Sequence, residues 1–262
     1  MTPSASAADV IAASDYGFRV CFGDPQQGTI AADTLTKDYS KIGVIYDTSD
    51  TYSSGIYAAF EAEMTTLGKK SGTDYFVYTF NKENNKDFST QVDGLSAEGC
   101  EVIFLPIYYQ PASVILKQAK DMGYEPTFFG VDGMDGILTL KGFDTSLAEG
   151  VMLLTPFAAD STDELTQNFV KTYNDKYGQT PNQFAADAYD AVYAVYEAIN
   201  KAGCTSDMTT EEICDAIVAV MPNIVLNGLT GQGMTWKSTG EVSKAPKAVV
   251  IKNGTYVLPE NQ

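Results

Sequence analysis

The chain of 262 residues carries 34 acidic and 17 basic side chains and no histidine. Its formal charge of −17 argues against nucleic acid and anionic membrane surfaces as partners, and the lack of histidine removes the usual general base and most zinc sites. No stretch approaches the roughly 20 apolar residues that span a bilayer, whereas a hydrophobic content of 44% is ample for one large domain or two smaller ones.

The first half of the chain alternates between strand-like and helix-like patterns. Residues 15–22 predict a short strand, and Asp24-Pro25 begins a helix that runs to about Asp38, because Asp caps a helix and Pro suits its first turn. The series continues with a strand at 41–47, a helix at 53–67, a strand at 74–80, a helix at 86–98, a strand at 101–106, a helix at 111–122 and a strand at 127–130. Such a series predicts an α/β fold with a parallel sheet.

The second half is richer in helices. An apolar strand at 150–157 is followed by a helix that carries Leu165, Phe169, Tyr173 and Tyr177, a helix that begins near Pro181, and a short helix at 209–220. Strand-like segments follow at 234–237, 248–252 and 255–258, with Asn253-Gly254 as a hairpin turn between the last two. The apolar helices need a sheet to pack on, and the sequence supplies too few strands for a second complete sheet.

Side chains that suit a small zwitterion stand where strands and loops end. Tyr52, Tyr108 and Asp132 each come just after a predicted strand, and Ser4 and Ser6 lie in the first loop. In an open α/β sheet, ligands lie in the crevice beyond the carboxyl ends of the strands. Hydroxyls, aromatic rings and one carboxylate at this edge indicate a binding site for an amino acid rather than a catalytic centre.

No pattern in the sequence indicates an enzyme, a metal or a cofactor. There is no G-x-G-x-x-G after a strand and no P-loop. Asp24, Asp47 and Asp50 are interpreted as caps and turns rather than as metal ligands.

The four cysteines form no C-x-x-C pair. Cys21 and Cys100 stand in or beside apolar runs and are expected to be buried thiols. Cys204 and Cys214 flank a polar turn and can form a local disulfide in an oxidising compartment. The sequence leaves that alternative open, because it cannot test the geometry of the bridge.

A set of short segments carries a family resemblance through its joint order and spacing. The segments are TPSAS at 2–6, FRVCFGDPQQG at 18–28, YSSG at 52–55, KDFS at 86–89, FLPIYY at 104–109, GVDGMDG at 130–136, EGVMLLTPF at 149–157, KYGQTPNQFAADAYDA at 176–191 and GLTGQGMTW at 228–236. With them the chain resembles the type I periplasmic solute-binding proteins of ABC importers, the leucine/isoleucine/valine-binding protein family.

The resemblance implies two Rossmann-like lobes with parallel sheets, joined by three crossovers. Lobe two is expected at 25–154, the remainder of lobe one at 1–20 and 158–262, and the hinges near 20–24, 155–158 and 228–236. Family members carry further residues before the TPSAS loop, so lobe one is expected to be incomplete in this chain. Met1-Thr2-Pro3 is not a signal peptide and is expected to correspond to an internal position of the family.

The resemblance also assigns roles to the candidate residues. Ser4 and Ser6 are expected to bind the α-carboxylate and to help with the ammonium. Tyr52 and Tyr108 are expected to cover the ligand from the other lobe, and Asp132 to pair with the α-ammonium. A buried ammonium needs a carboxylate partner, and a carboxylate needs converging N–H and O–H donors.

The predicted function is therefore capture of an amino acid, branched-chain or small and apolar, for an ABC importer. The expected partners are the amino-acid ligand and the permease subunits, with no nucleic acid and no direct membrane insertion of this chain. The expected location is the periplasm or, with a lipid anchor, the cell surface. The alternatives are the same scaffold binding an amide, urea or an aromatic acid, a sensory ligand-binding module, and an enzyme of doubly wound fold.

Overall fold

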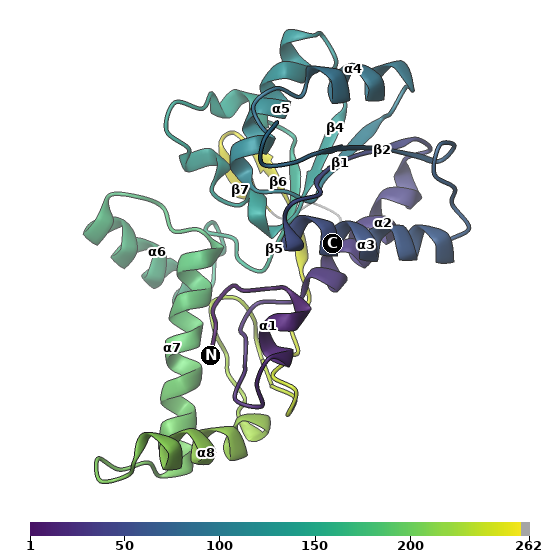
Figure 1. Cartoon of the computed structure of the whole chain (residues 1–262). Coiled ribbons are helices and arrows are strands. Elements are labelled where there is room, and N and C mark those ends of the chain that lie inside the picture. The colour runs from purple at the N-terminus through teal and green to yellow at the C-terminus, as the bar shows by residue number, and fades with distance from the viewer. Residues whose placement is uncertain (258–262) are drawn as a thin grey trace. The chain divides into compact units, whose positions relative to one another are not determined.

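The computed structural model describes residues 1–257 and divides into two compact units. Unit 1 comprises Met1–Gly23 and Pro156–Ala245, and unit 2 comprises Asp24–Thr155 and the chain from Pro246 onward. The ribbon of each unit can be followed by its residue colours in Figure 1. The third passage of the chain between the units falls after Ala245, beyond the segment 228–236 in which the sequence analysis placed it.

Unit 2 is built on one seven-stranded sheet with the order β2-β1-β3-β4-β5-β6-β7. The strands are β1 (Ile42–Asp47), β2 (Tyr75–Phe80), β3 (Val102–Leu105), β4 (Thr127–Gly130), β5 (Met152–Thr155), β6 (Lys247–Lys252) and β7 (Thr255–Val257). The first five pair in parallel, whereas β6 pairs antiparallel with β5 and β7 antiparallel with β6. The predicted α/β class with a mostly parallel sheet is confirmed.

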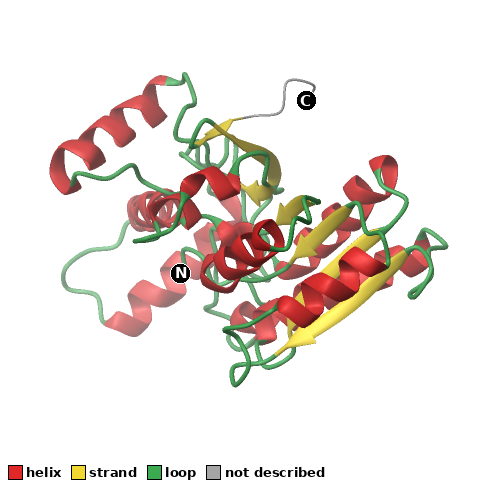
Figure 2. Ribbon diagram, turned by 90° about the horizontal axis from the view of Figure 1, so that it is seen from above, coloured by secondary structure: helices red, strands yellow, loops and turns green. Residues whose placement is uncertain are grey.

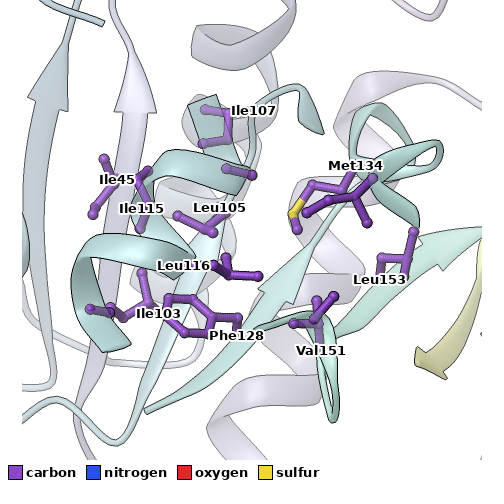
Figure 3. Packing of buried hydrophobic residues seen from close by; sticks show 14 of the residues in the cluster. Ile45, Ile103, Leu105, Ile107, Ile115, Leu116, Phe128, Met134, Val151 and Leu153 are labelled. Carbon is purple, nitrogen blue, oxygen red and sulfur yellow. The ribbon is translucent and has the colours of Figure 1, made fainter. Parts of the chain in front are cut away.

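Helices cover both faces of this sheet, because successive strand residues point to opposite sides. Val44 on β1 packs in a cluster with residues of α2 (Asp24–Asp38) and α3 (Thr51–Thr66). Its neighbour Ile45 packs in the opposite cluster, with α4 (Ser89–Ala97) and α5 (Tyr109–Asp121). Figure 3 shows this second cluster, in which Ile103 and Leu105 of β3 lie against Ile115 and Leu116 of α5. From α2 to β4 the helices and strands of the unit alternate along the chain as predicted, and Figure 2 shows the strands of the sheet flanked by helices.

The chain after β4 leaves the strand–helix alternation for three short 3-10 helices. They are η1 (Asp132–Met134), η2 (Ile137–Thr139) and η3 (Thr145–Ala148). Gly130, the last residue of β4, is required by packing, since a Cβ there would lie 2.1 Å from the sulfur of Met134. Met134 in turn is fully buried in the cluster with α5. The turn that follows β4 is therefore held close to the edge of the sheet.

The hairpin of β6 and β7 belongs to unit 2, although the sequence analysis assigned residues 158–262 to lobe one. Lys252 pairs with Thr255 across a two-residue turn, and both Asn253 and Gly254 have positive φ, 51° and 71°. These values fit the type I′ turn that Asn-Gly favours. The predicted hairpin is confirmed, and Leu258, the last residue of the predicted strand, lies outside the described residues. The assignment differs because β6 hydrogen-bonds to β5 rather than to any strand of unit 1.

Unit 1 contains helices and no strand within its described residues. The helices are α1 (Ala8–Ala12), α6 (Glu164–Tyr177), α7 (Gln183–Ala202), α8 (Thr210–Val220) and the 3-10 turn η4 (Met221–Asn223). The strand predicted at 15–22 forms only a parallel bridge between Thr2 and Arg19, and the segment 234–237 forms only isolated bridges.

The core of unit 1 joins distant segments around α7. Phe18 and Val20 pack with Ala194 of α7 and with Trp236, all nearly or fully buried. The rest of the helix surface is more open, because Val192 and Tyr196 are 69% and 56% exposed. Among the helices that the structure describes, none is both long and apolar enough to cross a membrane.

Candidate functional site

Three of the predicted site residues lie at one edge of the sheet of unit 2. Tyr52 stands in the first turn of α3 after β1, Tyr108 is the N-cap of α5 after β3, and Asp132 begins η1 after β4. The strands β1, β3 and β4 are consecutive neighbours in the sheet. Since the carboxyl ends of parallel strands meet at the same edge, the three side chains come together there as the sequence predicted.

Tyr52 and Asp132 form the buried centre of this group, with 8% and 4% of their surface exposed. The Tyr52 hydroxyl donates a hydrogen bond to Oδ1 of Asp132 and accepts one from the N–H of Gly133 at 2.8 Å. Burial, and then the neighbouring Asp132 carboxylate, hold the pKa of Tyr52 well above its usual range. Tyr52 therefore remains a neutral hydrogen-bond donor toward Asp132.

Gln27 is a further member of the group, which the sequence analysis did not single out. It is fully buried on α2, and its Nε2 donates to Oδ1 of Asp132 at 2.9 Å while its Oε1 accepts from the Asp132 N–H at 3.0 Å. The two bonds hold both the side chain and the backbone of Asp132. The only signal in the sequence was a Gln on the helix face that carries Ala31 and Leu35, since Gln is seldom fully buried without a partner.

Tyr108 lies over the buried pair of Tyr52 and Asp132 and forms the exposed side of the group. Its ring stacks on that of Tyr52 with 4.7 Å between centroids, and 43% of the residue is exposed. Burial, followed by the charges of Asp50 and Asp132, raises the pKa of Tyr108 to about 12. Gly133 lies beneath both rings, where a Cβ would come within 2.7 Å of the Tyr52 hydroxyl. The group thus presents a neutral aromatic surface next to a buried carboxylate.

The two predicted serines belong to unit 1, in the segment before α1. Ser6 is 6% exposed, and its carbonyl accepts a hydrogen bond from Nη1 of Arg19 at 2.6 Å. The hydroxyl of Ser4 donates to Oδ2 of Asp187 at 3.0 Å. Because this bond uses the only proton of the Ser4 hydroxyl, the hydroxyl oxygen can still accept a hydrogen bond but has no proton left for a ligand carboxylate.

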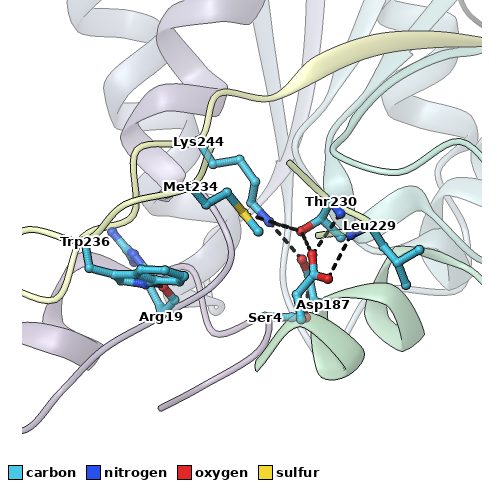
Figure 4. A network of polar contacts seen from close by, with 9 residues as sticks. Ser4, Arg19, Asp187, Leu229, Thr230, Met234, Trp236 and Lys244 are labelled. Carbon is cyan, nitrogen blue, oxygen red and sulfur yellow. Dashed lines mark hydrogen bonds and ion pairs between the residues drawn. The ribbon is translucent and has the colours of Figure 1, made fainter. Parts of the chain in front are cut away.

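Asp187 connects Ser4 to a buried polar network on α7, shown in Figure 4. Lys244 Nζ lies 3.0 Å from Oδ1 of Asp187 and donates to Oγ1 of Thr230 at 2.7 Å. Asp190, one turn along α7, accepts hydrogen bonds from the N–H groups of Leu229 and Thr230, both at 2.8 Å. Sequence reasoning missed this network, although two carboxylates three residues apart on an apolar helix face were a visible signal.

The described residues contain no group of three or more Cys, Asp or Glu side chains that could hold a metal ion. Cys21 and Cys100 are buried, as predicted. The alternative of a bridge between Cys204 and Cys214 is not realised in this structure.

The fold defines the chain as an α/β protein with a mostly parallel sheet, and Tyr52, Tyr108 and Asp132 come together at the carboxyl edge of that sheet. The model of the family described as "Periplasmic binding protein" matches residues 1–255. The chain belongs to this family, and the predicted resemblance is confirmed. At the level of the family, its homologues are solute-binding proteins and not enzymes.

Curated relatives are similar over most of this chain. It is 25% identical over 225 residues to the leucine-, isoleucine-, valine-, threonine- and alanine-binding protein of Pseudomonas aeruginosa, which covers 84% of this chain and 57% of that protein. The chain spans about half the length of the curated relatives it matches, with 51% and 55% for two others.

Two solved structures show the same fold. The leucine-binding protein LivK of Thermotoga maritima has a TM-score of 0.83 and 25% identity, over 99% of this chain and 71% of that one. A solute-binding protein of an ABC transporter from R. palustris, solved in complex with benzoate, has a TM-score of 0.81 and 16% identity, over 97% of this chain and 68% of that one. The second likeness concerns the fold alone.

Proposed function

We propose that this chain is the ligand-binding part of an extracytoplasmic solute-binding protein that captures an amino acid for an ABC importer. Branched-chain or small apolar amino acids are the favoured ligands, and the permease subunits of the importer are the expected partners. Membership of the periplasmic binding protein family and the name of the relative that binds leucine, isoleucine, valine, threonine and alanine support this proposal.

The observation that carries the proposal is the buried, oriented carboxylate of Asp132. The Tyr52 hydroxyl and the Gln27 amide donate to it, so they fix its direction. An α-ammonium is a cation with three N–H donors and complements such a carboxylate. The stacked ring of Tyr108, which is 43% exposed, offers an apolar surface beside it.

Ser4 and Ser6 keep their proposed roles as ligand contacts, with one refinement. Since the Ser4 hydroxyl donates to Asp187, we assign it to acceptance from the ammonium rather than to donation to the carboxylate. Ser6, whose hydroxyl makes no hydrogen bond to any described residue, is the serine that suits the α-carboxylate.

An aromatic acid is the second candidate ligand, because the protein solved with benzoate shares this fold. Such a ligand lacks the ammonium and gains little from Asp132. The two candidates therefore differ in whether binding needs the negative charge of this residue.

The test is a set of thermal melts of the chain with and without leucine, isoleucine, valine, alanine, benzoate and a polar amino acid. A ligand that binds only the folded state raises the midpoint, and an excess of about 100 times Kd stabilises by about 2.7 kcal/mol. We expect a selective rise with the branched-chain amino acids. A rise with benzoate alone would replace the amino-acid assignment, and no shift with any of them would contradict it.

A further inference from the structure

The segment 4–7 of unit 1 carries two proposed ligand contacts but has no regular structure of its own. It precedes the short helix α1, whose N-cap Ala7 makes no side-chain cap. Within the segment, the only backbone N–H with a bond to a neighbouring side chain is that of Ala5, which donates to Thr2 Oγ1 at 3.3 Å. Its conformation must therefore be set by contacts from elsewhere in the unit.

The first of these contacts is the buried ion pair of Lys244 and Asp187. Their side chains are 3% and 2% exposed, and Nζ and Oδ1 lie 3.0 Å apart. The second oxygen of Asp187 accepts the hydroxyl of Ser4 at 3.0 Å. Burial raises the pKa of Asp187, and the ammonium of Lys244 opposes that rise, so the lysine supports the charged acceptor to which Ser4 is bound. Figure 4 shows Lys244 and Ser4 on the two sides of Asp187.

The second contact is the guanidinium of Arg19, a residue that is 1% exposed. Its Nη1 donates to the carbonyl of Ser6 at 2.6 Å and to that of Ala7 at 3.1 Å. Its Nη2 pairs with Glu241 at 2.6 Å, and its own carbonyl accepts from Nε1 of Trp236 at 2.8 Å. A planar guanidinium holds two carbonyls and a carboxylate in one fixed geometry, whereas the three donors of a lysine ammonium rotate about its flexible side chain.

One buried cation, Arg19, thus binds the C-terminal end of the four-residue segment directly, and a second, Lys244, acts on its N-terminal end through Asp187. Buried ion pairs are a poor source of stability, because the loss of hydration offsets most of the attraction, and apolar side chains of similar size often replace them without loss. Such pairs instead fix the orientation of the groups they bind, since each charged donor leaves its acceptors only one favourable arrangement. At this segment, that orientation determines where Ser4 and Ser6 present their polar groups.

We propose that Lys244, acting through Asp187, and Arg19 are positioning residues that set the conformation of the segment 4–7 for ligand binding. The inference rests on the proposed function in that the segment is taken to contact an amino-acid ligand. The conformation of the segment, however, is a property of the protein without ligand. Two measurements therefore separate the two claims: hydrogen exchange of the amides of residues 1–12 without ligand, and the Kd for the amino acid that gives the largest shift in the melts.

The main variant is Lys244→Met, which keeps the length of the side chain and removes its charge. Its matched control is Lys247→Met, because Lys247 is exposed on β6. Since local opening governs exchange, we expect exchange in residues 1–12 to rise about tenfold in Lys244→Met, with no change over β1–β4, and the Kd to rise by at least about tenfold. Lys247→Met is expected to match the parent chain in both. Arg19→Lys keeps the positive charge but loses the planar set of N–H donors. We expect it to raise the exchange rate of the same amides.

The outcomes distinguish the claims. If the segment loosens and the Kd rises, while a Lys244→Met sample still melts as a folded protein, the inference is supported. If the segment loosens but the parent chain binds no amino acid, the positioning is supported and the proposed function fails. Unchanged exchange in residues 1–12, or a loosened segment with unchanged Kd, overturns the inference. Should Lys244→Met not fold, Ser4→Ala replaces it, since it removes only the hydroxyl that joins the segment to Asp187. Faster exchange of residues 1–12 in Ser4→Ala then supports the inference, and unchanged exchange overturns it.

Discussion

The hydroxyl of Tyr52 joins the side chain of Asp132 to the backbone of the turn that carries it. It donates to the Asp132 carboxylate and accepts from the N–H of Gly133 at 2.8 Å. Gln27 repeats this from α2, with one bond to the carboxylate and one to the Asp132 N–H. A side chain held in this way has its direction fixed before any ligand arrives, which lowers the entropy that binding must lose.

Replacement of Asp132 by asparagine tests the ammonium assignment. Asp132→Asn keeps an acceptor oxygen for Tyr52 and Gln27 but removes the negative charge. We expect amino-acid affinity to fall by at least about 100-fold, roughly the 3 kcal/mol that follows when a buried charged pair loses one partner. Calorimetric titration with leucine measures it, and Asp121→Asn, at an exposed carboxylate, is the control. Unchanged affinity in Asp132→Asn would exclude Asp132 as the partner of the ammonium.

The two stacked tyrosines are expected to respond differently to the loss of a hydroxyl. Tyr52→Phe removes the buried acceptor of the Gly133 N–H and one of the donors to Asp132, so we expect a loss of about 1–3 kcal/mol in the free energy of unfolding. The hydroxyl of Tyr108 makes no hydrogen bond to any described residue, and Tyr108→Phe should change stability by less than about 0.5 kcal/mol. Urea unfolding of both variants decides, and equal losses would contradict the assigned contacts.

The parallel half of the fold was predictable because its elements are local and regular. The strand at 127–130 has the predicted bounds, and β6 and β7 follow from the Asn253-Gly254 turn. The strand expected at 15–22 was wrong in type: alternation there reflects Phe18 and Val20 packing beneath α7, with one bridge to Thr2 in place of a ladder. Periodicity reports burial, and burial against a helix gives the same pattern as burial in a sheet.

The candidate site was predictable only in part, for a related reason. Tyr52, Tyr108 and Asp132 follow strand ends, and the parallel topology alone brings strand ends together. Gln27 and Lys244 reach their partners from 105 and 57 residues away. No local pattern marks such a pairing, because a single buried polar residue looks like an exposed one until the fold supplies its partner.

Gly28 is expected to be required where α2 crosses α3. A Cβ at this position would lie 2.3 Å from the carbonyl oxygen of Ile56 and 2.6 Å from the N of Phe60. These are backbone atoms and cannot turn aside, so we expect Gly28→Ala to lose about 1–3 kcal/mol of stability. Gly55, also inside a helix, has nothing nearer than an Asp24 oxygen at 3.8 Å, and Gly55→Ala should gain about 0.5–1 kcal/mol. Denaturant titration checks the opposite signs, and two losses or two gains would contradict the packing.

The thiols are expected to react in two classes. Cys214 is exposed and Cys204 half-buried, whereas Cys21 and Cys100 are buried. Burial also raises the pKa of the Cys100 thiol to about 11, which lowers its thiolate fraction. A thiol reagent added to the folded, unoxidised protein should therefore label Cys204 and Cys214 and reach the other two only after denaturation. Peptide mapping identifies the labelled residues, and protection of both Cys204 and Cys214 in the folded, unoxidised protein would contradict their exposure in the structure.

The N-cap residue of α6, Asp163, is expected to make the free energy of unfolding depend on pH in the acid range. Asp163 accepts the Ser161 hydroxyl at 2.6 Å and the Thr166 N–H at 2.9 Å, and these bonds, the first more than the second, hold its pKa below its usual range. A depressed folded-state pKa means that the unfolded chain binds the proton more tightly, so the contribution is complete above the unfolded value of about 3.9 and is lost as the pH falls through the folded one.

Asp163→Asn isolates this contribution, because asparagine still caps the helix but does not titrate. We expect the fall in unfolding free energy between about pH 7 and about pH 3 to be smaller in Asp163→Asn than in the parent chain. Urea unfolding at the two pH values measures that fall. Asp160→Asn, at an exposed carboxylate three residues before the N-cap, should reproduce the fall of the parent chain. If Asp163→Asn loses as much stability in acid as the parent chain, protonation of the Asp163 carboxylate does not contribute to the loss.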